Sequence, residues 1–242
     1  MIITHEVKDL IDLIEKTIKI PSVENLDPLF SNLISLLHKN CLAVRERYVD
    51  TQTRCFNLSA YPIDSDGYAQ SFDPITQEKE FFSAWQKYGV IVGKNIASDT
   101  QCNNVVNLMH EALSALSSNH FDINNPNTYT HIPRDESGVE IFSRGFFEIY
   151  HDAALAVIRQ NIRAYIHHVL IWGRADLWTS FDRLGLKLPR HEGAKGLRLH
   201  VDQNPDINPH FKTIQGVLAL VDCPVERGTF CAVPGSKYSL IV

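Results

Sequence analysis

The spacing of the hydrophobic residues changes after Gly173. Before that point, apolar side chains recur at intervals of three and four residues, which is the period of an amphipathic helix. This spacing predicts helices from Ile3 to Ile18, from Asp27 onwards, from Ser98 to Leu116 and from Asp152 to Trp172. After Gly173 the apolar residues alternate or form short runs, as they do in strands. We therefore expect helices first and a sheet last.

The predicted strands follow one another closely. They cover residues 177–183, 197–202, 211–222 and 228–233. Successive strands after helices favour a helix-flanked antiparallel sheet or barrel. Polar, turn-rich sequence from residue 50 to residue 80 indicates a long loop with a domain boundary near residue 75. We expect an N-terminal helical extension and loop over residues 1–75 and a second domain over residues 76–242.

Composition excludes several classes of protein. With 242 residues, of which 44% are hydrophobic, the chain can bury a substantial core. A net charge of −5 without a block of basic residues disfavours nucleic-acid partners. No run reaches the roughly 18–20 apolar residues of a membrane span, and the N-terminus lacks the apolar core of a signal peptide. Five cysteines without a C-x-x-C pair favour reduced thiols. We expect a cytoplasmic protein that binds neither nucleic acid nor membranes.

One predicted strand carries a histidine and an aspartate two residues apart, in the sequence Leu-Arg-Leu-His-Val-Asp-Gln-Asn-Pro. Side chains at positions i and i+2 of a strand leave the same face, so His200 and Asp202 could converge on one metal ion. Imidazole and carboxylate are two of the three ligands of a 2-His-1-carboxylate Fe(II) site. A hydrogen-bonded His/Asp pair on an exposed strand would give the same triplet. Taken alone, the motif leaves both interpretations open.

Further segments accompany this triplet in a fixed order. They are residues 88–96 (YGVIVGKNI), 176–183 (DLWTSFDR), 200–205 (HVDQNP), 215–222 (QGVLALVD) and 226–237 (ERGTFCAVPGSK). With them, residues 80–238 resemble the phytanoyl-CoA dioxygenase-like group of the Fe(II)- and 2-oxoglutarate-dependent oxygenases. The resemblance implies an α+β fold with a double-stranded β-helix (jelly-roll or cupin-like) core and flanking and N-terminal helices.

The same resemblance implies a chemistry. His200 and Asp202 would bind Fe(II), and 2-oxoglutarate would be the cosubstrate. The implied reaction is hydroxylation of a small organic substrate, coupled to decarboxylation of 2-oxoglutarate. Gln215 is a candidate for a contact to the cosubstrate or to metal-bound water, with a solvent-facing glutamine as the alternative. No catalytic residue is predicted beyond the metal ligands.

The chain departs from the family pattern after Asp202. An active member needs a second histidine and a basic residue on later strands. Here the only histidine after Asp202 is His210, which lies in a turn-rich connection. We expect an incomplete core whose open sheet edges would allow self-association. Three interpretations stay open: a truncated oxygenase with little activity, a non-catalytic binding or scaffold protein derived from that fold, and an active enzyme whose third ligand is His210 or comes from a second subunit.

Overall fold

Helices dominate the part of the chain that the structure describes. The computed structural model describes residues 1–18, 26–49, 59–131, 146–147, 150–180, 183–186, 199–200, 213–227 and 230–235. Its α-helices are α1 (His5–Ile18), α2 (Asp27–Val49), α3 (Glu78–Tyr88), α4 (Asp99–Leu116), α5 (Ala153–Arg159) and α6 (Ile162–Trp172). Short 3₁₀ helices are η1 (Pro126–His131) and η2 (Val225–Arg227), and the strands are β1 (Ser71–Phe72), β2 (Val92–Gly93), β3 (Phe146–Phe147) and β4 (Leu184–Gly185).

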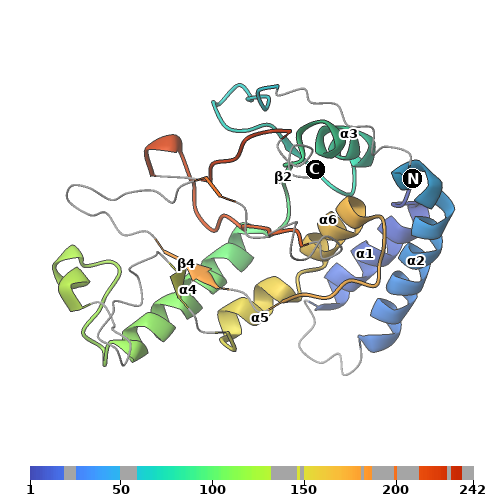
Figure 1. Ribbon diagram of the computed structural model, residues 1–242. Helices are drawn as coiled ribbons and strands as arrows, with labels where there is room; N and C mark the ends of the chain where they lie inside the picture. Colours follow the sequence, from blue (N-terminus) through green and yellow to red (C-terminus); the bar gives the residue numbers. More distant parts are fainter. Residues whose placement is uncertain are drawn as a thin grey trace, which may run out of the picture.

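The first two helices pack against each other, as their periodicity predicts. Val7, Ile11 and Ile14 of α1 are fully buried, and so are Leu33 and Leu37 of α2. These residues join side chains of α3 and α6 in the main hydrophobic cluster. Figure 1 shows α1, α2, α3 and α6 grouped at one end of the molecule. The main cluster thus contains residues from both sides of the boundary placed near residue 75, and that boundary stays a prediction.

A second cluster forms around α4 and α5. Val105, Met109 and Leu113 of α4 pack with Leu155 of α5 and Leu184 of β4. A capping box lies at the start of α4, next to the predicted helix start at Ser98: the Ser98 hydroxyl accepts a hydrogen bond from the Gln101 amide, and the Gln101 side chain accepts one from the Ser98 amide. Two orphan backbone donors are satisfied in this way, which fixes where α4 begins.

The single helix predicted from Asp152 to Trp172 is interrupted. It is divided into α5 and α6, because the side chain of Asn161 accepts hydrogen bonds from the amides of Arg163 and Ala164 and so begins a new helix. Gly173 ends α6 in the left-handed conformation, with φ of 62°. The break turns α6 away from α5 and onto α3.

The prediction of an α+β fold with a double-stranded β-helix core is wrong. Each strand in the described chain has two residues: β1 pairs with β2 in a parallel sheet, and β3 pairs with β4 in an antiparallel one. Where the predicted strands over residues 177–183, 197–202, 211–222 and 228–233 fall on described residues, they belong to no sheet, and β4 begins one residue after the first of them. Along residues 213–222 the half-buried apolar side chains pack against the helix-based clusters and not against a second sheet.

Residues 213–222 show this arrangement clearly. Ile214 packs against the main cluster, and Leu220 packs against the second cluster. Between them, Leu218 lies beside Cys102 and Val105 of α4. In Figure 1 the orange-red stretch accordingly runs from the side of α6 towards α4. This stretch, the crossing segment, connects the two hydrophobic clusters.

None of the described helices has the length and apolarity needed to cross a bilayer.

Candidate functional site

The predicted metal ligands are only partly covered by the described residues. His200 is described and its side chain is exposed, whereas Asp202 and His210 lie outside the described residues. Gln215 is exposed at the start of the crossing segment. Within the described chain, no three His, Cys, Asp or Glu side chains are grouped so that they could hold a metal ion. The predicted iron site therefore stays a prediction.

Two adjacent histidines on α6 form a pair that the sequence analysis missed. The ring of His167 meets the ring of Phe81 edge-on, with centroids 4.9 Å apart. It also lies against β2, where a Cβ atom on Gly93 would come within 2.6 Å of its Cδ2 atom. Only glycine allows such an approach of strand and helix. Gly93 ends the apolar run of residues 90–92, but no local pattern points from it to His167.

Burial fixes the protonation of His167. Desolvation is the main cause that lowers its pKa to about 4, and the nearby His168 lowers it further. The imidazole of His167 is therefore neutral at physiological pH.

The neighbouring His168 has a defined tautomer. Its Nδ1 atom lies 2.8 Å from the carbonyl oxygen of Ala164. A carbonyl only accepts, so Nδ1 carries a proton, and in the neutral ring Nε2 is then the nitrogen with the lone pair. A Cβ atom on Gly216 of the crossing segment would lie 3.4 Å from that Nε2. A backbone carbonyl on one ring nitrogen is also the arrangement that orients metal-ligating histidines. His168 is thus a chemically suitable ligand. Its Nε2 atom faces Gly216, which is the residue after Gln215.

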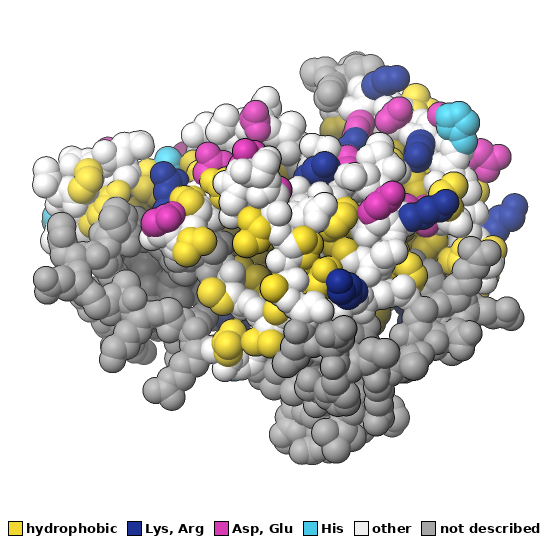
Figure 2. Space-filling view, turned by 90° about the horizontal axis from the view of Figure 1, so that it is seen from above, with side chains coloured by type: hydrophobic (Ala, Val, Ile, Leu, Met, Phe, Trp, Pro, Cys, Tyr) yellow, Lys and Arg dark blue, Asp and Glu magenta, His cyan; other side chains and the backbone are white. Residues whose placement is uncertain are grey.

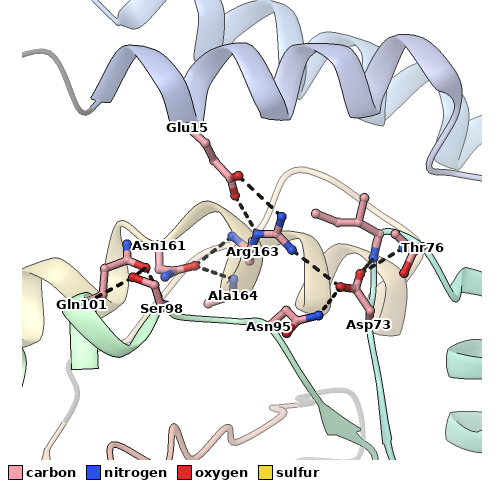
Figure 3. A network of polar contacts seen from close by, with 10 residues as sticks. Glu15, Asp73, Thr76, Asn95, Ser98, Gln101, Asn161, Arg163 and Ala164 are labelled. Carbon is pink, nitrogen blue, oxygen red and sulfur yellow. Dashed lines mark hydrogen bonds and ion pairs between the residues drawn. The ribbon is translucent and has the colours of Figure 1, made fainter. Parts of the chain in front are cut away.

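A second polar centre surrounds Asp73, which is only 5% exposed. Its Oδ1 atom accepts the amides of Ile75 at 2.8 Å and Thr76 at 3.0 Å. Its Oδ2 atom accepts Nδ2 of Asn95 at 2.8 Å and lies 3.8 Å from the guanidinium of Arg163. Figure 3 shows these groups converging on the carboxylate. Both carboxylate oxygens of Asp73 are therefore engaged within the protein.

This centre continues to the N-terminal helix. The Nε atom of Arg163 donates to Glu15 of α1 at 2.6 Å, as Figure 3 also shows. Burial by itself would raise the pKa of Asp73, but the hydrogen bonds from Asn95, Thr76 and Ile75 and the charge of Arg163 hold it below its usual value. The network joins α1, α6 and the segment before α3, and its hydrogen bonds to a buried carboxylate make it a structural centre.

Comparison with protein-family models, with curated proteins and with solved structures finds no match to this chain. The oxygenase resemblance is therefore carried by the sequence segments alone.

The buried His167 makes the fold sensitive to acid. Its pKa of about 4 in the folded state lies below the value of 6.5 expected when the chain is unfolded, so the unfolded state binds the proton more readily between those values. The contribution of neutral His167 to the free energy of unfolding is fully present above pH 6.5. The free energy of unfolding should fall by about 3 kcal/mol as the pH drops to 4.

Urea unfolding across this pH range would measure the effect. Other groups titrate over the same interval, so the comparison is with His167→Gln, whose pH profile should be flatter than that of the wild type. Parallel profiles for the two proteins would contradict the assignment to His167.

Proposed function

We propose that this chain is an Fe(II)- and 2-oxoglutarate-dependent dioxygenase-like protein whose metal is held by His200 and Asp202. The observation that carries the proposal is the His-Val-Asp triplet in its ordered set of accompanying segments. Exposure of the His200 side chain supports it, because a metal ion in solution can reach an exposed ring. The substrate would be a small organic molecule.

The donor chemistry fits Fe(II) in part. An imidazole and a carboxylate are suitable ligands, but a facial site needs a third. Since the described residues hold no group of three such ligands, we derive no step of oxygen chemistry. Two candidates for the third ligand are His210, given by the sequence, and His168, given by the structure. His168 is favoured by its free Nε2 lone pair facing Gly216, the residue after Gln215.

An anaerobic calorimetric titration of the full chain with Fe(II) tests the metal proposal. We expect one site per chain, weakened by at least about tenfold in His200→Ala and in Asp202→Ala because each removes one ligand. His5→Ala is the matched control, since His5 is an exposed histidine on α1. Unchanged binding by both ligand variants would contradict the proposal.

The same titration separates the candidates for the third ligand. If His168 completes the site, His168→Ala weakens binding as strongly as His200→Ala does, and His210→Ala leaves it unchanged. Release of succinate from 2-oxoglutarate by the Fe(II)-loaded protein, lost in His200→Ala, would establish the oxygenase reaction. Tight metal binding without any turnover of 2-oxoglutarate would limit the function to metal binding.

A non-catalytic binding function is favoured by a different observation. Val217, Val225 and Phe230 are 79%, 76% and 66% exposed. Large apolar side chains that remain in water along one stretch mark a surface for a partner. Figure 2, which views the molecule from above, shows apolar side chains open to solvent across the centre of that face, with charged side chains of both signs spread around and among them.

A further inference from the structure

The crossing segment contains a sequence that reads the same in both directions. Residues 217–221 are Val-Leu-Ala-Leu-Val, centred on Ala219. If two copies of this stretch lie antiparallel about a two-fold axis at Ala219, Val217 faces Val221 of the second copy and Ala219 faces itself. The two leucines face each other in the same way. An isologous contact requires a surface that is complementary to itself, and this stretch meets that condition.

Burial alternates along the stretch as it does in a strand. Leu218 and Leu220 are half-buried against the helices, whereas Val217 and Val221 are 79% and 59% exposed. The exposed pair is the pair that would meet across the two-fold axis. Cross-strand contacts between β-branched side chains are among those that stabilise antiparallel strands.

The backbone of the stretch is available for pairing up to Leu220, whereas the carbonyl of Val221 accepts the thiol of Cys223 at 3.2 Å. No hydrogen bond to the backbone of residues 216–220 is formed within the described chain. Unpaired amides and carbonyls in an apolar, strand-patterned stretch are a template for an added strand. Charge does not oppose the pairing, because Asp222 at one end would face Gly216 of the second copy and not another carboxylate.

We propose that residues 217–221 form an antiparallel strand pair with a second copy of this chain, centred on Ala219. The palindrome identifies a second copy of this chain as the partner. A strand from an unrelated protein would need only the exposed valines and the unpaired backbone, and the palindrome would give it no advantage. The proposal does not rest on the metal site.

Sedimentation velocity over a concentration series tests the dimer. Val217→Lys should weaken it by at least about tenfold, because an unpaired ammonium then faces Val221 of the second copy. Adding Val221→Glu to the same chain should restore it, because each lysine then faces a glutamate across the axis. Ile63→Lys, also at an exposed β-branched side chain but outside the crossing segment, is the matched control and should leave the dimer unchanged.

Cross-linking tests the register. In a Cys223→Ser, Cys231→Ser background, oxidised glutathione should link two copies of Ala219→Cys, whereas Val217→Cys should link only when mixed with Val221→Cys. A protein that is monomeric at all concentrations, a Val217→Cys variant that links to itself as readily as Ala219→Cys, or assemblies that grow beyond a dimer would each overturn the proposal. Repeating the series with His200→Ala, without added metal, keeps a failure of the metal proposal separate.

Discussion

Asp73→Ala should lower the free energy of unfolding by about 3–5 kcal/mol. The substitution removes the acceptor of three donors, the amides of Ile75 and Thr76 and the side chain of Asn95, and it takes an anion away from Arg163. Because Asp73 is buried, water cannot easily replace these bonds. Urea unfolding followed by circular dichroism at neutral pH would measure the loss.

Asp73→Asn is the matched control. It keeps the size of the side chain and the acceptor for Ile75 and Thr76, so its cost should be clearly smaller. The pH dependence gives a second check. The pKa of Asp73 lies below its usual 3.8, so its contribution is present above that pH and is lost as the pH falls through the lowered value. An alanine variant as stable as the wild type would show that the network is not a structural centre.

Phe81→Ala, made in the wild-type chain, should lower the free energy of unfolding by about 3–5 kcal/mol. Phe81 is fully buried in the main cluster, and its ring supports the ring of His167. Truncation leaves a cavity that its neighbours, held on α3 and α6, can fill only in part. Differential scanning calorimetry would record the lower transition temperature.

This substitution also changes a titration. Burial is the main cause of the low pKa of His167, so a cavity that admits water should move that pKa upwards from about 4. Histidine proton shifts in an NMR titration would follow it. Phe81→Leu is the control, because it fills most of the space and should leave the pKa close to the wild-type value. A pKa that does not respond to Phe81→Ala would show that other side chains keep the ring dry.

The local part of the fold could be predicted from the sequence. Helix α1, the start of α2 and the capping box of α4 follow from patterns within a few residues of one another. The interruption at Asn161 could not be seen, because the apolar residues keep helical spacing across it and only the side chain of Asn161 marks the new start. The sheet was predicted wrongly, because alternation of side chains reports extended chain and does not report what lies beside it.

The candidate sites follow the same division. His200 and Asp202 form a pattern over three residues and are visible in the sequence. The contact of His167 with Gly93 and that of Asp73 with Arg163 join residues that are far apart along the chain, and nothing local to either partner indicates the other. A histidine doublet in an amphipathic helix and an Asp-Pro pair in a loop both have ordinary local explanations. Tertiary packing alone distinguishes these residues.

Helix α3 connects two distant parts of the chain. Its first residue, Glu78, accepts the amides of Ile2 and Ile3, and the carbonyl of its last residue, Tyr88, accepts the amide of Gly235. A helix of 11 residues spans about 16 Å, so residues 2 and 235 are held about one short helix apart. Helix α3 thus holds a segment near each end of the described chain, with two hydrogen bonds at its first residue and one at its last. Hydrogen exchange at the amides of Ile2, Ile3 and Gly235 would therefore show whether these two segments leave α3 together.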